Sequence, residues 1–273
     1  MSFVGIKSAG FMTTVQDAGR VGYAHYGVSA SGPADSVSLR IGNLLVGNPE
    51  NAAALEMTLV GGTFEFESNG LVALSGSSFA AQIGKAAAPF WTSFHVKAGQ
   101  ILTVGPSLSG ARCYLCIHGG IGVFPVLGSR STHLLTGIGG FEGRALKQGD
   151  RIPINSDGGI GSVPLRTIDQ KTVIALFDRQ SFRVTIGPQF DFFAQESLDL
   201  FLNSNYEVLE DSNRMGLRLR GPQIVRSRAG DMLTEGVSLG AIQISHDGQP
   251  IILFVEHQTT GGYPKIANII SAE

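Results

Sequence analysis

Three polar segments of the sequence, each flanked by glycines, carry residues suited to binding a small polar ligand. They are residues 13–22, 212–219 and 258–265. Glycine allows close approach of the backbone, so the N–H groups of such segments can reach a ligand. The segments also supply Arg20, Arg214 and Lys265, whose cationic groups can orient a carboxylate or a carbonyl. From the residues alone two interpretations stay open: these groups bind a ligand, or pairs such as Asp17 with Arg20 hold turns in place.

One serine stands in a pattern typical of hydrolase nucleophiles. The segment Gly236-Val237-Ser238-Leu239-Gly240 matches G-x-S-x-G. That pattern is catalytic where a strand precedes the serine and a helix follows it, because the sharp turn between them projects the hydroxyl. Here residues 241–244 alternate like a strand. We therefore interpret the segment as a glycine-rich turn between strands.

The cysteines and histidines show no metal-ligand spacing. Cys113 and Cys116 lie in segment 111–117, which we predict to be a strand. Side chains three positions apart on a strand face opposite sides, so these thiols cannot easily share a metal ion or a disulfide. We expect two buried, unreactive thiols. The six histidines show no H-x-H or H-x-x-x-H pattern, so no metal site is predicted.

Bulk composition argues against several classes of protein. The net charge is −2 and no basic stripe is visible, so nucleic-acid binding is not expected. No apolar stretch reaches the length of about 18 residues that a membrane helix requires. The N-terminus lacks the pattern of a secretory signal, and the chain has two cysteines, so we expect a cytoplasmic protein. Neither a P-loop nor a dinucleotide-binding glycine pattern occurs, so this chain is not expected to bind ATP by a standard loop.

Composition and periodicity predict a mostly β chain. Glycine accounts for 37 of 273 residues, which indicates many turns and short strands. Strands are predicted at residues 63–67, 183–186, 241–244 and 251–255, the last buried on both faces. The glycine-rich stretch 153–164 is predicted to be a linker or long surface loop. It separates an N-terminal β subdomain at 1–155 from a C-terminal β subdomain at 165–273.

Two short helices are also predicted. The first begins at Pro33, a favourable first helical residue, and stops at Gly47. The second begins near Pro188 and ends at Asn203. Their expected apolar faces are Val37, Ile41, Leu44 and Leu45 in the first helix, and Phe190, Phe193, Leu198, Phe201 and Leu202 in the second.

Motifs along nearly the whole chain resemble those of the allophanate hydrolase subunit 2 family, which includes the C subunit of 5-oxoprolinase and the partner of a sporulation-kinase inhibitor. The residues that carry the resemblance are 13–22, 27–35, 45–49, 54–56, 119–121, 127–132, 146–150, 214–216, 235–236, 248–250 and 258–267. The resemblance implies a cyclophilin-like β-barrel architecture with two β subdomains.

The same resemblance implies a function. It identifies the chain as the C subunit of an ATP-dependent 5-oxoprolinase complex, a hydrolase that opens 5-oxoproline to glutamate. The chain would share a site with a subunit-1 (B-subunit) homologue, and a third component would join the complex. A lactam is a poor electrophile, and phosphorylation of its oxygen creates a leaving group for the attack of water. No cofactor would be bound by this chain, and ATP would be used by the complex.

Two alternatives remain open within the family. The first is half of a biotin-dependent carboxyltransferase that acts on urea or another amide, with biotin carried by another protein. The second is a binding protein that antagonises a sporulation-kinase inhibitor. All three hypotheses share the subunit-1 interface, and the two enzymes share a substrate with an N–C=O group.

With this resemblance, the polar segments become candidate substrate-binding residues, while the catalytic residues stay unknown. We predict that Asp17 and Arg20 position the substrate and that Arg214 binds a substrate carboxylate. The predicted pocket groups are Thr259, Tyr263 and Lys265. No metal ligand is predicted.

Two features depart from the family pattern. Glu256-His257 stands where the family usually has an acidic residue followed by arginine. The sequence ends at Glu273, before a further helix and strand that are usual in the family. This ending predicts a short or truncated C-terminal subdomain with an exposed sheet edge.

Overall fold

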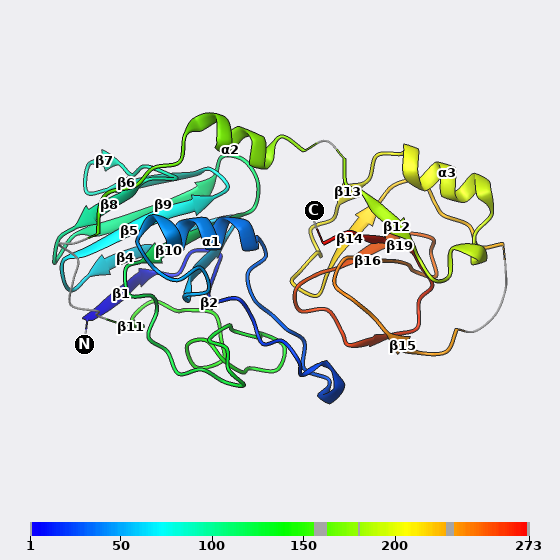
Figure 1. The fold of residues 1–273 in the computed structure, drawn as a ribbon, viewed down its shortest axis with the longest axis horizontal. Helices are drawn as coiled ribbons and strands as arrows, with labels where there is room; N and C mark the ends of the chain where they lie inside the picture. Colours follow the sequence, from blue (N-terminus) through cyan, green and yellow to red (C-terminus); the bar gives the residue numbers. More distant parts are fainter. Residues whose placement is uncertain (1, 156–162, 180, 228–231, 272–273) are drawn as a thin grey trace. The chain divides into compact units, whose positions relative to one another are not determined.

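The computed structural model of the protein describes residues 2–155, 163–179, 181–227 and 232–271. The chain forms two compact units (Figure 1). The first unit comprises Met1–Arg20 and Ser31–Phe177, and the second comprises Val21–Ala30 and Asp178–Glu273. Both are built mainly from short antiparallel strands, so the predicted mostly β class is confirmed.

The described residues of the first unit form two antiparallel sheets and two α-helices. Its strands are β1 (Ser2–Ser8), β2 (Met12–Gln16), β3 (Ala54–Thr58), β4 (Thr63–Phe66), β5 (Gly70–Gly76), β6 (Phe79–Ile83), β7 (Ala86–Ala87), β8 (Ser93–Val96), β9 (Ile101–Ser107), β10 (Arg112–Ile117) and β11 (Arg151–Ile154). Its helices are α1 (Ser36–Leu45) and α2 (Gln170–Phe177). The sheet orders are β11-β1-β4-β9-β6-β7 and β2-β3-β10-β5-β8.

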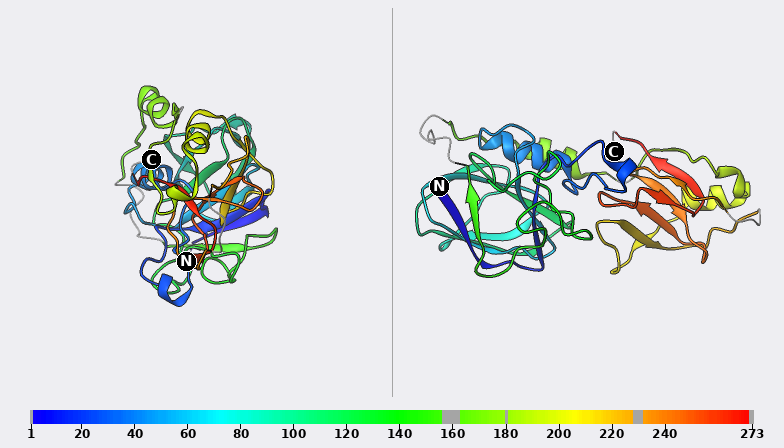
Figure 2. Two further views of the ribbon diagram at one scale, coloured as in Figure 1. Left: turned by 90° about the vertical axis from the view of Figure 1, so that its right-hand side faces the viewer. Right: turned by 90° about the horizontal axis from the view of Figure 1, so that it is seen from below.

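A single apolar core joins the two sheets of the first unit. Phe64 and Phe66 of β4 belong to the same buried cluster as Leu55 and Met57 of β3 and Leu115 of β10. In Figure 2 the blue helix α1 lies outside the strands of the first unit. Strand β4 fits the predicted alternation, since its phenylalanines are buried and its other residues are half-buried. Burial of apolar surface from both sheets stabilises the unit.

Helix α1 begins and packs differently from the sequence-based expectation. It begins at Ser36, because Asp35 accepts a hydrogen bond from the backbone N–H of Ser38 at 2.9 Å and so caps the N-terminus. The predicted face was partly wrong: Val37 and Leu44 are 45% and 44% exposed. The buried face consists of Ser38, Leu39, Gly42, Asn43 and Leu45.

A small residue explains this difference. A Cβ at Gly42 would lie 2.4 Å from the Oγ of Ser75 and 2.7 Å from the Sγ of Cys116. The helix therefore approaches β5 and β10 most closely at its glycine, and its larger apolar residues at positions 37 and 44 turn outward. A prediction based only on large apolar side chains therefore misses a buried face that is centred on glycine.

The two cysteines occupy opposite faces of β10, as predicted. Cys113 belongs to the core between the sheets, whereas Cys116 belongs to the cluster beneath α1. Both are free and fully buried. Burial raises the pKa of the Cys113 thiol far above its usual value and that of Cys116 to about 12.

The second unit is built around one six-stranded sheet of order β12-β19-β16-β17-β14-β13 and a two-stranded β15-β18 pair. Its strands are β12 (Val184–Ile186), β13 (Glu207–Val208), β14 (Gly216–Arg220), β15 (Glu235–Gly236), β16 (Ala241–Ile244), β17 (Pro250–Leu253), β18 (Thr260–Gly261) and β19 (Lys265–Ile269). Its helical segments are η1 (Ala24–Tyr26), η3 (Phe190–Phe192) and α3 (Gln195–Asn203).

Two predictions for the second unit need correction. The helix expected from Pro188 is split, because the backbone is extended at Phe193 and Ala194, between η3 and α3. Phe193 is buried in the core, whereas Leu202 is 62% exposed. The run at 251–255 was expected to be buried on both faces, but in β17 Ile251 and Ile252 are only half-buried.

The boundary between the units involves two segments. Helix α2 was not predicted, and residues 165–177 belong to the first unit. There the N–H of Ile168 donates to the carbonyl of Trp91 at 2.9 Å, and Thr167 forms a β-bridge with Thr92. Residues 21–30 belong to the second unit, whereas the predicted ranges were 1–155 and 165–273. Part of the predicted linker, 156–162, lies outside the described residues. No helix within the described ranges has the length and hydropathy of a membrane span.

The burial of both thiols generates a prediction. At pH 8 a thiol-specific reagent such as Ellman's reagent should leave Cys113 and Cys116 unmodified in the folded protein, because both are buried and protonated. In denaturant both should react. Absorbance of the released thionitrobenzoate measures the number of modified thiols, and rapid modification of the folded protein would contradict the placement of β10.

Candidate functional site

The carboxylate of Asp17 lies at the centre of a buried hydrogen-bond network in the first unit. Its Oδ1 accepts from the N–H of Gly19 at 2.9 Å and from the hydroxyls of Ser129 and Ser131 at 2.5 and 2.7 Å. Its Oδ2 accepts from the N–H of Arg130 at 2.5 Å. Asp17 is 7% exposed and both serines are fully buried. The network therefore fastens the end of β2 to a loop 113 positions later in the chain.

Backbone pairing extends this attachment along β2. The N–H of Thr132 donates to the carbonyl of Val15 at 2.9 Å. The side chain of Gln16, the last residue of β2, donates to the carbonyl of Thr132 at 3.2 Å. Asp17 follows Gln16 directly, so the strand sets the place of its carboxylate.

Arg20 supports the same loop from inside the protein. Its guanidinium donates to the carbonyl of Ser131, and the side chain is 2% exposed. A Cβ at Gly139 would lie 2.4 Å from the Nη2 of Arg20 and 2.1 Å from the oxygen of Ser131, so only glycine fits there. Arg20 is therefore a buried group that holds the loop.

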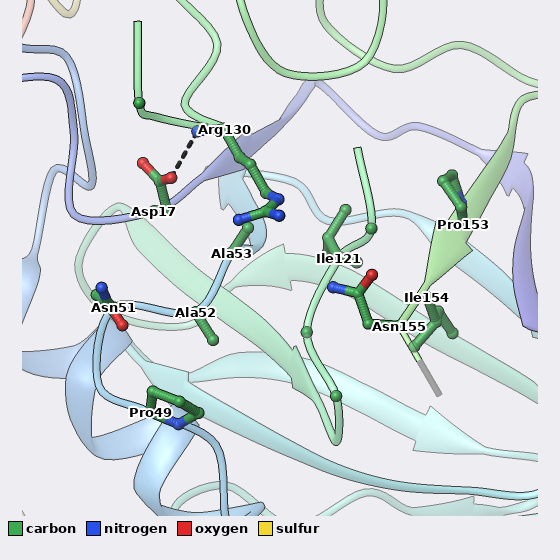
Figure 3. Close-up of a pocket in the computed structure, with 14 residues that line it drawn as sticks. Asp17, Pro49, Asn51, Ala52, Ala53, Ile121, Arg130, Pro153, Ile154 and Asn155 are labelled. Carbon is green, nitrogen blue, oxygen red and sulfur yellow. Dashed lines mark hydrogen bonds between the residues drawn. The ribbon is translucent and has the colours of Figure 1, made fainter. Parts of the chain in front are cut away.

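A cavity of about 690 Å³ lies beside the Asp17 network (Figure 3). Its volume is within the range of small-molecule sites. The lining residues are Asp17, Pro49, Asn51, Ala52, Ala53, Gly119, Gly120, Ile121, Gly122, Gly128, Arg130, Pro153, Ile154 and Asn155. They come from the end of β2, the segment before β3, the turn after β10, the 128–130 loop and the end of β11. We call this space the Arg130 cavity.

One wall of the Arg130 cavity depends on a close backbone approach. A Cβ at Gly119 would lie 1.7 Å from the carbonyl oxygen of Asn155, so a larger residue cannot occupy this turn. The N–H of Gly119 donates to the side chain of Asn48 at 2.8 Å, and the N–H of Asn155 donates to the carbonyl of Gly120 at 3.0 Å. These contacts place Asn155 at the rim.

The polar groups of the Arg130 cavity can bind an anion and an amide. The Nε of Arg130 donates to the carbonyl of Val123 at 2.8 Å, which fixes the plane of the guanidinium. Asn51 and Asn155 are exposed residues whose side-chain amides can each donate and accept. A guanidinium is well suited to a carboxylate or a phosphate.

A second cavity, of about 600 Å³, lies within the second unit. Two predicted site residues, Thr259 and Lys265, line it together with Ser238. Lys265 is 5% exposed, and its Nζ pairs with the carboxylate of Glu235. Hydrogen bonding from Lys265 holds the pKa of the Glu235 carboxyl below its usual range. The charge of Lys265 is therefore already matched by a carboxylate.

The other two predicted residues of the second unit lie elsewhere. Tyr263 lines a smaller cavity of about 150 Å³, and its ring meets that of His246 edge-on at 5.2 Å. Arg214 is 2% exposed and forms an ion pair with Glu256 at 2.5 Å. Glu256 is the acidic residue of the Glu256-His257 departure, and in this chain it pairs with an arginine that lies 42 positions earlier.

The structure thus distributes the six predicted residues over different places. Asp17 and Arg20 meet at Ser131, and Thr259 and Lys265 share a cavity. The sequence-based prediction omitted the polar lining residues Arg130, Asn51 and Asn155. Arg130 had a recognisable signal, since it stands in Gly128-Ser129-Arg130-Ser131, a polar segment beside a glycine. The asparagines had none, because only the fold brings them to this cavity.

Ser238 is placed as the sequence predicts. A strand, β16, follows it instead of a helix, and its hydroxyl donates to the side chain of Asn268 at 2.9 Å. Among the described residues no group of three or more histidine, cysteine or acidic side chains is arranged to hold a metal ion.

Comparison with known proteins gives a consistent set of relatives. The model of the carboxyltransferase domain, subdomain A and B, matches residues 26–273. The chain is 45% identical to the C subunit of 5-oxoprolinase from Escherichia coli K12 over 270 residues, which covers 98% of this chain and 84% of that protein. It is 34% identical to the corresponding 5-oxoprolinase protein of Haemophilus influenzae, over 95% of this chain and 82% of that protein.

A solved structure extends the comparison to a larger enzyme. The chain matches the crystal structure of the Kluyveromyces lactis urea amidolyase with a TM-score of 0.90 and 34% identity. The match covers 99% of this chain and 18% of that enzyme. The fold therefore also occurs as one part of a much longer polypeptide.

The Asp17 network generates a prediction about stability. Asp17→Asn places an amide N–H₂ group among hydrogen-bond donors and should lower the free energy of unfolding by about 2–4 kcal/mol. Urea denaturation followed by the fluorescence of Trp91, the single tryptophan, measures this in the first unit. Glu65→Gln, which removes a carboxylate from the partly exposed pair with Lys7, is the matched control and should change little. Equal midpoints for the two variants would refute the network's structural role.

The Arg214–Glu256 pair generates a second prediction. Arg214→Ala leaves a buried carboxylate without its partner and should cost about 3–5 kcal/mol of stability. Arg220→Ala, which breaks the exposed pair with Glu207, should have little effect on the thermal midpoint measured by circular dichroism. If Arg214→Ala abolished enzymatic activity and left the thermal midpoint unchanged, Arg214 would be a substrate ligand. That is the role predicted from the sequence.

Proposed function

Because the chain belongs to the family of carboxyltransferase domains with subdomains A and B, we propose that it acts as the C subunit of a 5-oxoprolinase complex. The observation that carries this proposal is the 45% identity to the Escherichia coli protein over 98% of this chain and 84% of that protein. The chain is a non-autonomous subunit of a hydrolase that converts 5-oxoproline to glutamate with ATP.

The chemistry of the reaction explains why more than one subunit takes part. The lactam carbonyl of 5-oxoproline is stabilised by its nitrogen and resists water. Transfer of the γ-phosphoryl group of ATP to the lactam oxygen activates the carbon, and water attacks it. The C–N bond then breaks, which opens the ring and leaves a γ-acyl phosphate. A second water hydrolyses this acyl phosphate and releases phosphate. Glutamate, ADP and phosphate are the products. The Arg130 cavity supplies binding groups but no paired nucleophile and base among its described lining residues.

The proposed partners follow from this division of labour. A subunit-1 (B-subunit) homologue shares the substrate site with this chain, and a third component completes the complex. ATP is bound outside this chain, whose sequence contains no P-loop pattern. We place the complex in the cytoplasm, where ATP is available.

A second candidate function is carboxyl transfer to urea or a related amide with biotin on another protein. The observation that favours it is the likeness to the Kluyveromyces lactis urea amidolyase, at a TM-score of 0.90. The two functions share a substrate with an N–C=O group. We rank 5-oxoproline hydrolysis first because the two 5-oxoprolinase relatives match over most of their own length.

Reconstitution tests the proposal. The purified chain is combined with its subunit-1 homologue and the third component, and glutamate formation from 5-oxoproline is measured with and without ATP. We expect ATP-dependent glutamate and loss of at least about 90% of the activity when this chain is omitted, because the site is shared.

Two results would reject the proposal. One is unchanged glutamate formation without this chain. The other is carboxylation of urea by the chain, its partner and a biotinylated carrier, with no turnover of 5-oxoproline. A variant with Arg166→Gln, an exposed arginine away from the Arg130 cavity, serves as the activity control.

A further inference from the structure

We infer that the Arg130 cavity is the carboxylate-binding subsite of this chain, in which the Arg130 guanidinium binds the carboxylate of a small lactam or amide. Asn51 and Asn155 are placed to contact the amide group of the same molecule. The identification of 5-oxoproline as that molecule rests on the proposed function. The anion-binding role of Arg130 rests on the structure alone.

The charge of Arg130 is the first support. Its Nε is bound to the carbonyl of Val123, and the carboxylate of Asp17 contacts its backbone N–H. Across the described ranges, no carboxylate forms an ion pair with its guanidinium. Figure 3 shows the guanidinium pointing away from the Asp17 carboxylate. A positive charge at a cavity wall without an acidic partner favours an anionic ligand.

The state of Asp17 is the second support. Its carboxylate receives four hydrogen bonds, from Gly19, Ser129, Arg130 and Ser131. These bonds hold the carboxylate in the loop, so it cannot turn towards the guanidinium without breaking them. Asp17 is therefore a positioning residue that presents Arg130 to the cavity and does not neutralise it.

The two asparagines are the third support. No hydrogen bond of either side-chain amide is formed with the described residues, whereas the backbone of Asn155 is fixed by its bond to Gly120. In Figure 3 Asn51 and Asn155 stand on different sides of the cavity. A side-chain amide both donates and accepts, as does the N–C=O group of a lactam. One guanidinium with two amides therefore matches a molecule that carries one carboxylate and one amide.

Lys265, Arg20 and Arg214 do not offer the same chemistry. Lys265 is paired with Glu235 and Arg214 with Glu256, and Arg20 donates to a backbone carbonyl. The carboxylate role that the sequence assigned to Arg214 therefore passes to Arg130.

Binding to the full-length chain tests the inference directly. Isothermal titration at low ionic strength uses L-5-oxoproline, 2-pyrrolidinone, which lacks the carboxylate, and inorganic phosphate. We expect 5-oxoproline to bind at least about 10-fold more tightly than 2-pyrrolidinone, because a charge-assisted contact is lost. Phosphate, which lacks the amide, should bind more weakly than 5-oxoproline.

Variants at one position give the second arm. Arg130→Gln should weaken 5-oxoproline binding by about 10- to 100-fold and leave the weak binding of 2-pyrrolidinone unchanged. Arg130→Lys keeps the charge and should recover part of the affinity. Arg166→Gln, an exposed arginine of the same unit, is the matched control and should bind 5-oxoproline normally. Circular dichroism shows whether each variant is folded.

Several outcomes would overturn the inference. These are equal affinity for 5-oxoproline and 2-pyrrolidinone, unchanged affinity in a folded Arg130→Gln variant, or no binding of 5-oxoproline to the chain. Arg130-dependent binding of phosphate alone would make the cavity a phosphate site and reject the carboxylate assignment. If binding depends on Arg130 but reconstitution yields no glutamate, the proposed function fails and the anion site stands. If reconstitution yields glutamate but binding does not depend on Arg130, the anion site is rejected and the proposed function stands.

Discussion

The first unit depends on one buried carboxylate. Asp17 accepts hydrogen bonds from both serines and the central N–H of the 129–131 loop, and it thereby joins the end of β2 to a distant part of the chain. A buried carboxylate is costly unless its oxygens are satisfied, so the loop and the carboxylate require each other. Arg20 contributes positive charge to the same place through its bond to Ser131. Asp17 and Arg20, which the sequence predicted to position the substrate, thus build the framework of the cavity.

That framework determines what the cavity can do. Because Asp17 is occupied by the loop, Arg130 faces the cavity without an acidic partner among the described residues, and the glycine turn at Gly119 brings Asn155 to the rim. The result is a cavity whose polar groups suit a charged, amide-containing small molecule. In the complex that we propose, the activating group and the nucleophile would come from the other components.

The sequence predicted local features well and the cavity poorly, for physical reasons. Two-residue periodicity predicted β4, β16 and the opposite faces of Cys113 and Cys116, since side-chain direction in a strand depends only on position. The buried face of α1 was partly wrong because close packing at Gly42 outweighed the larger apolar residues. The Arg130 cavity was missed because its walls come from five separate segments of the chain. Pairing between distant strands brings these segments together, and no local sequence pattern records that pairing.

In our proposal the first unit binds the carboxylated lactam through Arg130. Amide chemical-shift mapping of the full-length chain during titration with L-5-oxoproline tests it most directly. We expect the largest shift changes at the backbone amides of 119–122 and 128–131 and at the side-chain amides of Asn51 and Asn155. Shift changes concentrated instead around Thr259 and Lys265 in the second unit, with none at the 128–131 loop, would contradict it.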